Sequence, residues 1–451
     1  MRRGWFFSVC LALNACVPIE ATDNAPVIAE ETASLPAMRT FAAASVPGPY
    51  VSNTDLARDF LDLSFALENG QRLDVFTRFE GPISVAVTGD APASLLTDLG
   101  SLITRLQREA RINILQVSGP ANITIEAVQR REIRRILPSA ACFVVPNVSS
   151  LREYRGARRS SRTDWTQLTE RRRIAVFVPS DASPQEIRDC LHEELAQAIG
   201  PLNDLYRLTS SVFNDDDVHT VLTGYDMLIL RIYYAPELRN GMSRNAVAAR
   251  LPVILSRLNP GGGSGPSRLA SDTPNEWRDA VQTALGPGTG AAGRKSAARK
   301  ALSIATEEGW QDNRRAFSHF ANGRILSRSD PDLARAHFEA AYQFYARLPG
   351  TELHRAFVAT QLAAQAITEQ DGARALSLIQ PHIGTAQNSQ NAALLSTLLL
   401  LQAEALDLMG QSEEAEAVRL DSLGWARYGF GPDWAVRAKV SEIGALNPQK
   451  G

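Results

Sequence analysis

The chain is poor in cysteine and histidine and has no long apolar run beyond its first twenty residues. It contains four cysteines and six histidines in 451 residues. Only His192 and His219 precede residue 259, which excludes a zinc site made of three histidines in that part of the chain. Because no stretch of eighteen apolar residues follows residue 20, we expect no internal transmembrane helix.

The sequence also lacks an excess of charge of one sign. Its 47 basic and 49 acidic side chains give a formal net charge of −2, so no global field attracts nucleic acid or acidic lipid. It contains no glycine-rich phosphate loop, no Gly-x-Ser-x-Gly nucleophile elbow and no nucleic-acid-binding motif. We therefore expect no nucleic-acid partner.

The first residues predict export. Arg2 and Arg3 precede a short apolar segment, residues 5–13, which is typical of a signal peptide. The run Leu-Asn-Ala-Cys that ends at Cys16 resembles a bacterial lipobox. It predicts a signal peptide over residues 1–15 and a protein lipidated at Cys16, anchored to a membrane and facing the periplasm. The alternative is cleavage near Ala21, which would give a soluble periplasmic protein.

Two further cysteines, Cys142 and Cys190, remain in the predicted mature chain. In an oxidising compartment, two cysteines in one domain are more often a structural disulfide than reactive thiols. We expect a disulfide, with two buried free thiols as the alternative.

Composition divides the chain into regions. Residues 16–50 are rich in alanine, proline and threonine, which predicts a flexible tether, and the glycine- and proline-rich residues 259–272 predict a linker. Between them, residues 51–258 mix amphipathic helical patterns with short strands, which indicates an α+β domain. The strands are expected at residues 83–87, 112–117, 123–128, 142–145 and 174–178.

Two helix signals in this domain are also clear. Leu56, Phe60, Leu63 and Leu67 recur at intervals of three and four, which predicts a helix that residues 52–54 can cap and that Gly70 ends. Residues 183–186, Ser-Pro-Gln-Glu, form a capping-box start and predict the beginning of a second helix.

Residues 273–447 are alanine-rich and predict an all-α domain. Ala336, Ala375 and Ala415 recur at intervals of 39 and 40 residues, each close to an expected helix start. The pattern resembles degenerate tetratricopeptide-like helical hairpins, which implies stacked antiparallel helices. Such a surface would offer contacts to an envelope protein partner.

One predicted helix carries the candidate chemistry. Its residues Glu193, Glu194, Gln197, Gly200 and Asn203 have the spacing Glu-Glu-x-x-Gln-x-x-Gly-x-x-Asn. This resembles the metzincin pattern His-Glu-x-x-His-x-x-Gly-x-x-His, with all three histidines replaced. The resemblance implies a zincin-like fold, with Glu193, Gln197 and Asn203 at the metal-ligand positions and Glu194 at the position of the catalytic glutamate.

The resemblance continues downstream. Residues 210–214, Ser-Ser-Val-Phe-Asn, stand where matrix-type metalloproteases have their Met-turn, with Phe213 in place of methionine. Residues 222–226, Leu-Thr-Gly-Tyr-Asp, are similar to the start of the closing helix of that fold. A narrower set of motifs resembles a bacterial family often described as lipoproteins, domain of unknown function 2927, which brings no established activity. These motifs lie at residues 193–200, 203–204, 213–215, 222–226 and 241–242.

The position of Glu194 on the predicted helix also makes it a candidate site residue. On an ideal helix Glu194 falls within the apolar arc that includes Cys190 and Ala198. A carboxylate in such a position is costly unless it is hydrogen-bonded or beside a cleft, so its pKa is a candidate for perturbation. The alternative is a structural carboxylate. His192 points to the other side of the helix and is expected at the surface or in a second layer.

The donor set argues against zinc. Glu193, Gln197 and Asn203 are oxygen donors, of which two are uncharged, so we expect no cofactor. A hard divalent cation such as calcium, with Asp204 or residues 215–217 as further ligands, is the alternative.

An arginine-rich stretch lies between Arg130 and Arg173. We expect a solvated loop. The alternative is a contact with anionic headgroups or with a polyanionic envelope polymer, for which residues 171–173 are the candidates.

The sequence thus favours an envelope lipoprotein that binds or scaffolds without catalysis. The alternative is a divergent hydrolase or peptidase with Glu194 as general base.

Overall fold

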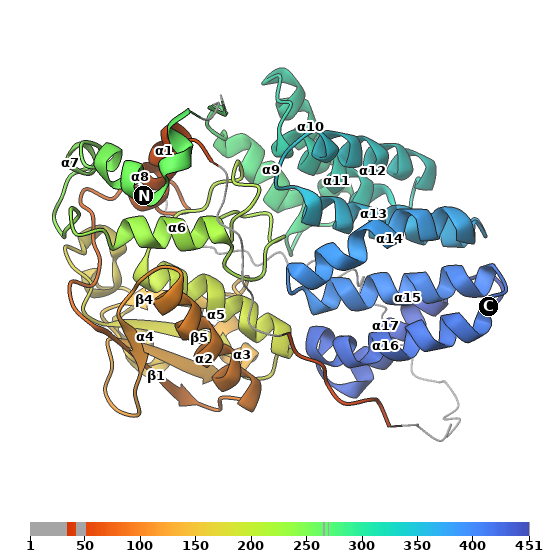
Figure 1. Cartoon of the computed structure of the whole chain (residues 1–451), viewed down its shortest axis with the longest axis horizontal. Helices are drawn as coiled ribbons and strands as arrows, with labels where there is room; N and C mark the ends of the chain where they lie inside the picture. Colours follow the sequence, from red (N-terminus) through yellow and green to blue (C-terminus); the bar gives the residue numbers. More distant parts are fainter. Residues whose placement is uncertain (1–33, 42–50, 265–266, 269, 451) are drawn as a thin grey trace.

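The computed structural model describes residues 34–41, 51–264, 267–268 and 270–450. They form two halves that lie side by side in Figure 1, an α/β domain followed along the chain by an all-helical domain. The predicted signal peptide and Cys16 lie outside the described residues, so lipidation stays a prediction.

The first domain is built on one five-stranded sheet with the order β2-β1-β3-β5-β4. All neighbours are parallel except β4, which runs antiparallel to β5. The five expected strands are confirmed as β1 (Ile83–Gly89), β2 (Ile114–Gln116), β3 (Ile123–Val128), β4 (Phe143–Pro146) and β5 (Ile174–Pro179). The expected α+β class is corrected to α/β, because connections that contain helices join parallel strands.

The strand β5 is buried on both of its faces. Its residues Ile174, Val176 and Val178 belong to the main core, whereas Ala175 and Phe177 belong to a second, smaller core. This alternation follows from the two-residue period of a strand. Two long helices cover the first face and two short ones the second: α2 (Ala93–Arg108) and α5 (Pro184–Ile199), then α3 (Arg130–Arg134) and α4 (Leu151–Ala157).

Further helices complete the domain around the main core. They are α1 (Asn53–Ser64), α6 (Gly224–Tyr233), α7 (Arg244–Ala248), α8 (Leu251–Leu258) and the 3-10 turns η1 (Ser161–Thr163), η2 (Trp165–Gln167) and η3 (Pro260–Ser264). Ser52 caps α1 by accepting a hydrogen bond from the Asp55 amide. The helix is shorter than its apolar spacing predicted, because Leu67, although fully buried, lies beyond its end and pairs with Gln71 in a turn.

Part of the predicted linker is packed against α1. Ser267 donates a hydrogen bond to the Asp55 carboxylate at 2.8 Å, and Arg268 forms an ion pair with Asp59. Arg58 of α1 donates to the carbonyl of Ala270 at 3.0 Å. Charged groups on α1 therefore hold the described residues of the linker in place.

Part of the predicted tether also contacts the folded body. Within residues 34–41, the Arg39 amide donates to the carbonyl of Gly424 at 3.0 Å. The ring of Phe41 stacks on Trp425 with 4.6 Å between the ring centroids. This segment thus lies against the helical domain.

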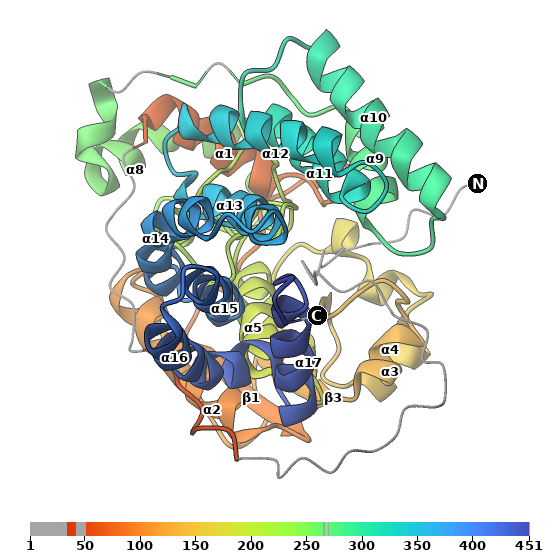
Figure 2. The ribbon, with the colours of Figure 1, turned by 90° about the vertical axis from the view of Figure 1, so that its right-hand side faces the viewer.

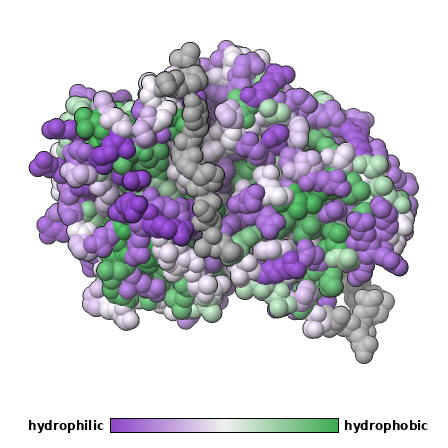
Figure 3. Space-filling view, in the orientation of Figure 1, coloured by the Kyte–Doolittle hydropathy of each residue, from purple (hydrophilic) through white to green (hydrophobic). Residues whose placement is uncertain are grey.

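The second domain consists of successive helices that pack mainly against their neighbours in sequence. They are α9 (Asn275–Leu285), α10 (Ala291–Glu307), α11 (Asn313–Leu326), α12 (Pro331–Ala346), α13 (Glu352–Thr368), α14 (Gly372–Asn388), α15 (Ala392–Leu408), α16 (Ser412–Phe430) and α17 (Asp433–Gly444). Among the described residues, no helix has the length and apolar character needed to cross a membrane. Figure 3 shows hydrophilic side chains over most of one face of the molecule, interrupted by smaller apolar areas.

The alanine repeat marks alternate helices of this domain. Ala375 and Ala415 are each the fourth residue of a helix, α14 and α16, and both are fully buried. The equivalent residue of α12 is the fully buried Ala334, whereas Ala336 is exposed. The repeat therefore has a spacing of 41 and then 40 residues, and small side chains at these sites let neighbouring helices approach closely.

A disulfide joins Cys142 and Cys190, whose Cα atoms are 5.9 Å apart. It links the residue before β4 to the middle of α5, and both cysteines are buried in the main core. The bond therefore fastens the central helix to the sheet.

Replacing both cysteines, as Cys142→Ala with Cys190→Ala, is expected to lower the free energy of unfolding by about 2–4 kcal/mol, because a closed loop of this length restricts the unfolded chain. Denaturant unfolding followed by circular dichroism measures the change. Reduction of the unaltered protein should have a similar effect, and an unfolding midpoint that is insensitive to reductant would contradict the linkage.

Candidate functional site

The helix α5 carries the candidate site, and its two ends are fixed by local sequence. At its start, Ser183 accepts a hydrogen bond from the Glu186 amide and Pro184 occupies the first turn, which favours helix initiation. The helix ends at Gly200, where a Cβ atom would lie 2.5 Å from Leu230 of α6. The absence of a side chain at Gly200 thus lets α6 cross the end of α5.

Arg171 binds the C-terminal end of α5. Its guanidinium donates to the carbonyls of Gln197 and Ala198 at 2.7 and 2.9 Å and to the hydroxyl of Tyr233 at 3.2 Å. A cation at this position satisfies free carbonyls and opposes the helix dipole. The expectation of a solvated loop is therefore wrong for Arg171, which is 3% exposed, although Arg172 is exposed.

The structure places Glu194 inside the core. Its side chain is 1% exposed, and its Oε1 atom has no hydrogen-bond partner among the described residues. Burial raises the pKa of Glu194 well above its ordinary value, and the carboxylates of Glu193 and Glu68 raise it further. The predicted perturbation of this carboxyl group is thus present in the structure.

The three predicted ligand positions lie in different surroundings. Gln197 is buried and donates to the Glu68 carboxylate at 3.1 Å, while Glu193 is half-buried. Asn203 donates to the backbone carbonyl of Asp62 at 2.9 Å, and its Oδ1 atom has no partner among the described residues. The amide groups of Gln197 and Asn203 therefore serve as hydrogen-bond donors here.

Sequence reasoning missed Glu68, which belongs to the same site. Glu68 follows α1 by a few residues, yet it meets Gln197 of α5 and raises the pKa of Glu194 and Asp204. With Asp215 these side chains form what we call the acidic cluster: Glu68, Glu193, Glu194, Asp204 and Asp215. No spacing rule could have revealed Glu68, because it lies more than 120 residues away in sequence.

Protons stabilise the acidic cluster. Burial raises the pKa of Glu68 to about 8, with Asp215 and Glu193 adding repulsion. Burial likewise raises the pKa of Asp215 to about 6 and that of Asp204 well above its ordinary value. Neighbouring carboxylates in a site of low polarity cannot all ionise at neutral pH, so they share protons.

The described part of the chain contains no group of three or more histidine, cysteine, aspartate or glutamate side chains arranged to hold a metal ion. The side chains of Gln197 and Asn203 are neutral amides, which lack the imidazole, thiolate or carboxylate groups that bind zinc. These two side chains thus do not fit the ligand set of zinc.

The helical domain covers the acidic cluster. Tyr206, two residues after Asp204, packs edge-on against Trp277 of α9 at 4.8 Å and accepts a hydrogen bond from Asn313 through its carbonyl. Arg278 of α9 donates to the backbone carbonyl of Glu68 at 3.3 Å.

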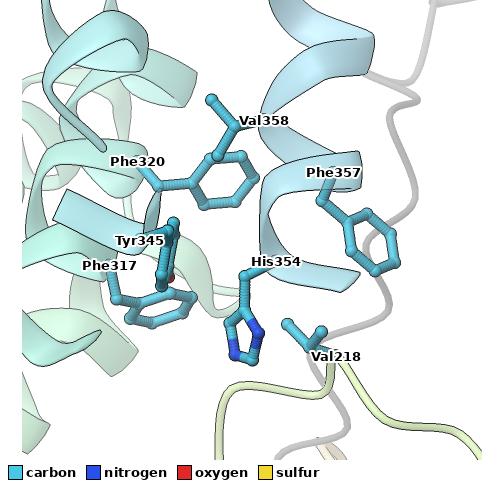
Figure 4. Close-up of a pocket in the computed structure, with 7 residues that line it drawn as sticks. All are labelled: Val218, Phe317, Phe320, Tyr345, His354, Phe357 and Val358. Carbon is cyan, nitrogen blue, oxygen red and sulfur yellow. The ribbon is translucent and has the colours of Figure 1, made fainter. Parts of the chain in front are cut away.

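A second contact joins the loop after Asp215 to the helical domain. Asp216 accepts a hydrogen bond from His354 of α13 at 2.9 Å, and both side chains are almost fully buried. Figure 4 shows the His354 ring pointing toward the loop that carries Val218. A cavity of about 10 Å³ remains there, enough for about one water molecule, lined by Val218, Phe317, Phe320, Tyr345, His354, Phe357 and Val358.

The first half of α5 is also tied to the helical domain. Gln185 donates to the Asn391 side chain at 3.1 Å and accepts from the Ala393 amide at 2.9 Å. Arg188 donates to the carbonyl of Gln390. Figure 2 shows α5 beside α15, so the first half of α5 lies at the interface between the domains.

His192 is a buried residue in a second layer. Its Nδ1 atom accepts a hydrogen bond from the Leu222 amide at 3.1 Å, and burial holds its pKa well below the ordinary value. A neutral imidazole with this partner positions the loop before α6. The expectation of a second-layer residue agrees with this position, and the surface alternative does not.

The turn at residues 210–214 is held by α6. Asp226 accepts hydrogen bonds from the Ser211 hydroxyl at 2.5 Å and the Val212 amide at 3.2 Å, and it also completes a capping box with Thr223. Phe213 is fully buried in the main core. The turn therefore has a structural role beneath α5.

Residues 53–253 match the family model described as "Protein of unknown function (DUF2927)". The match supports the predicted domain of unknown function over these residues. A search of curated proteins and a search of solved structures each found no match.

The folded protein is expected to be more stable at acidic pH than at neutral pH, because burial raises the pKa of Glu68 in the acidic cluster. Glu68 titrates near 4.5 when unfolded and near 8 when folded, so the folded state binds the extra proton between these values. The free energy of unfolding should therefore decrease as pH rises from 4.5 to 8, by up to about 1.4 kcal/mol per pH unit for one proton.

Thermal unfolding at intervals between pH 5 and 8.5 measures this effect. In Glu68→Gln the slope should flatten, whereas Glu413→Gln, an exposed position on α16, should leave it unchanged. A stability that is constant or that rises over this range in the unaltered protein would contradict the proton-sharing arrangement.

Proposed function

We propose that the chain is an exported, lipid-anchored envelope protein that binds or scaffolds other molecules without catalysing a reaction. Its α/β domain has, in this proposal, a zincin-like fold whose peptidase site is degenerate. The observation that carries the proposal is the set of side chains at that site and their surroundings. Neutral amides stand at two of the three ligand positions, and burial raises the pKa of the neighbouring Glu68 and Glu194. Tyr206, close to the site, packs against the helical domain.

The order of elements supports the zincin-like part of the proposal. The sheet is followed by α5, which carries Glu193, Glu194 and Gln197, and then by a sharp end at Gly200. A tight turn at residues 210–214 and the helix α6 come next, and α6 holds the turn. This is the order that the metzincin resemblance implies.

The lack of a catalytic arrangement follows from physical chemistry. A zinc-dependent hydrolase needs imidazole, thiolate or carboxylate ligands and an open coordination position that water and substrate can reach. Here Gln197 donates to Glu68, Asn203 donates to a backbone carbonyl, and Tyr206 lies under α9. These contacts support a non-catalytic role for the site.

The helical domain supports a role in binding. Its helices α9–α16 stack in sequence order, with buried alanines at equivalent positions of α12, α14 and α16. We propose a tetratricopeptide-like arrangement in which the face turned away from the α/β domain contacts an envelope protein partner. Trp434, 73% exposed at the start of α17, is one residue available for such a contact.

A divergent hydrolase is the second candidate. The observation that favours it is Glu194 itself, whose buried Oε1 atom has no partner among the described residues and whose pKa is raised by burial. A carboxyl group of this kind is suited to act as a general base once water reaches it. Access would require the helical domain to move away from Tyr206.

Restoring the missing ligands tests the zincin-like proposal. The triple variant Glu193→His, Gln197→His and Asn203→His is expected to bind one zinc ion per chain, because the scaffold would then present three imidazoles at the metzincin spacing. Zinc titration with a competing chelator measures the binding.

A matched control places histidines at Gln116, Gln167 and Asn245, which are exposed and belong to separate elements. Zinc binding that is no tighter in the site variant than in this control would contradict the zincin-like arrangement.

Glu194→Gln separates the two functional candidates. If Glu194 is a structural group, removing its charge should raise the unfolding temperature at pH 8 and have little effect at pH 5, because burial penalises only the ionised form. A variant with unaltered stability at both pH values and a lost hydrolytic activity in a peptidase screen would favour the hydrolase instead.

A further inference from the structure

The short helices α3 and α4 present arginines to solvent on the outer side of the sheet. Their inward faces supply Ile133, Leu151 and Ala157 to the smaller core against Phe177. Figure 2 shows the two helices side by side, and Glu132 of α3 forms an ion pair with Arg155 of α4. Seven exposed arginines lie on these helices or directly after them: Arg131, Arg134, Arg135, Arg152, Arg155, Arg158 and Arg159.

An open depression of about 340 Å³ lies between the two helices. It is lined by three of these arginines, Arg135, Arg155 and Arg158, with the buried side chain of Ile136. This volume is at the small end of the range for ligand sites in proteins. It suits one compact polar group better than an extended chain.

The charges around the depression do not balance. Glu132 forms ion pairs with Arg135 and Arg155, whereas Arg158 forms none with any residue that the structure describes. Three guanidinium groups against one carboxylate leave a charge of +2. A phosphomonoester carries about −1.5 to −2 at neutral pH and offers three acceptor oxygens, so its charge and valence match this depression.

The one carboxylate of α4, Glu153, pairs with arginines outside the depression. Glu153 forms ion pairs with Arg162 and Arg173 and accepts a hydrogen bond from the Ser149 amide. It therefore does not neutralise the arginines of the depression.

Further arginines surround the depression. Arg131, Arg134, Arg152 and Arg159 are exposed and form no ion pair within the described chain. Guanidinium groups bind phosphate oxygens in a bidentate manner and are only weakly hydrated, which favours such contacts. Their field would raise the local concentration of an anionic ligand near Arg158.

We propose that the depression between α3 and α4 binds a phosphomonoester group, held by Arg135, Arg155 and Arg158. The group can belong to a soluble phosphorylated molecule or to a lipid headgroup, and both present the same chemistry to the three guanidinium groups. This site is separate from the acidic cluster and does not depend on the function proposed for that cluster.

Calorimetric titration of the purified full chain tests the proposal. The soluble arm uses glycerol 1-phosphate, with sodium sulfate and glycerol as comparisons. The lipid arm uses phosphatidylcholine vesicles that contain phosphatidic acid, whose headgroup is a monoester, and vesicles of phosphatidylcholine alone. Both arms are run at physiological ionic strength, because weak surface attraction is then largely screened.

The test variant is Arg135→Gln with Arg158→Gln. Both side chains are exposed, so the fold should persist, and circular dichroism verifies this. The control variant is Arg299→Gln with Arg328→Gln, which removes two exposed arginines of the helical domain that form no ion pair with described residues. Each variant removes two positive charges, so the two variants differ only in the positions of the replaced arginines.

We expect the phosphomonoester to bind in at least one arm, more tightly than sulfate, with affinity reduced at least tenfold in the test variant and unchanged in the control. Binding in the soluble arm identifies a free ligand, and binding confined to the vesicles identifies a headgroup. The proposal is overturned if neither arm binds, if sulfate binds equally well, or if both variants lose affinity to the same degree.

Discussion

The structure depends on the burial of one helix, α5, that carries many polar side chains. Twelve of its sixteen residues are buried, among them Arg188, His192, Glu194 and Gln197. A buried polar group must find a partner or lose its charge. Both solutions are used here. Arg171 satisfies the carbonyls at the end of the helix, and His192 stays neutral beside a backbone amide. Burial raises the pKa of Glu68, Glu194 and Asp204, which favours their neutral forms.

This constraint explains why the two domains form one body. The sheet covers only one side of α5, and a disulfide fastens the helix to that side. The other side meets the helical domain through Gln185 and Arg188, and the loop that follows α5 meets it through Tyr206 and Asp216. The helical domain thus completes the burial of α5.

The spacing of apolar residues along the sequence was sufficient to predict the strands and α5, and the capping residues were sufficient to predict the start of α5. These features depend only on residues that are close in sequence. The same local pattern was not sufficient for contacts between distant segments. Glu68 joins the acidic cluster, and Arg171 binds α5, only because the chain folds back on itself. The length of α1 was also overestimated, since Leu67 is buried in a turn, where burial follows from tertiary packing and not from helical period.

The central claim is that protons, and not a metal ion, neutralise the acidic cluster. Elemental mass spectrometry of the full chain, purified without chelator, tests it most directly. The account predicts far less than one equivalent of any divalent metal per chain. One equivalent of metal in the unaltered protein, lost in a folded Glu193→Ala and Gln197→Ala double variant, would contradict it.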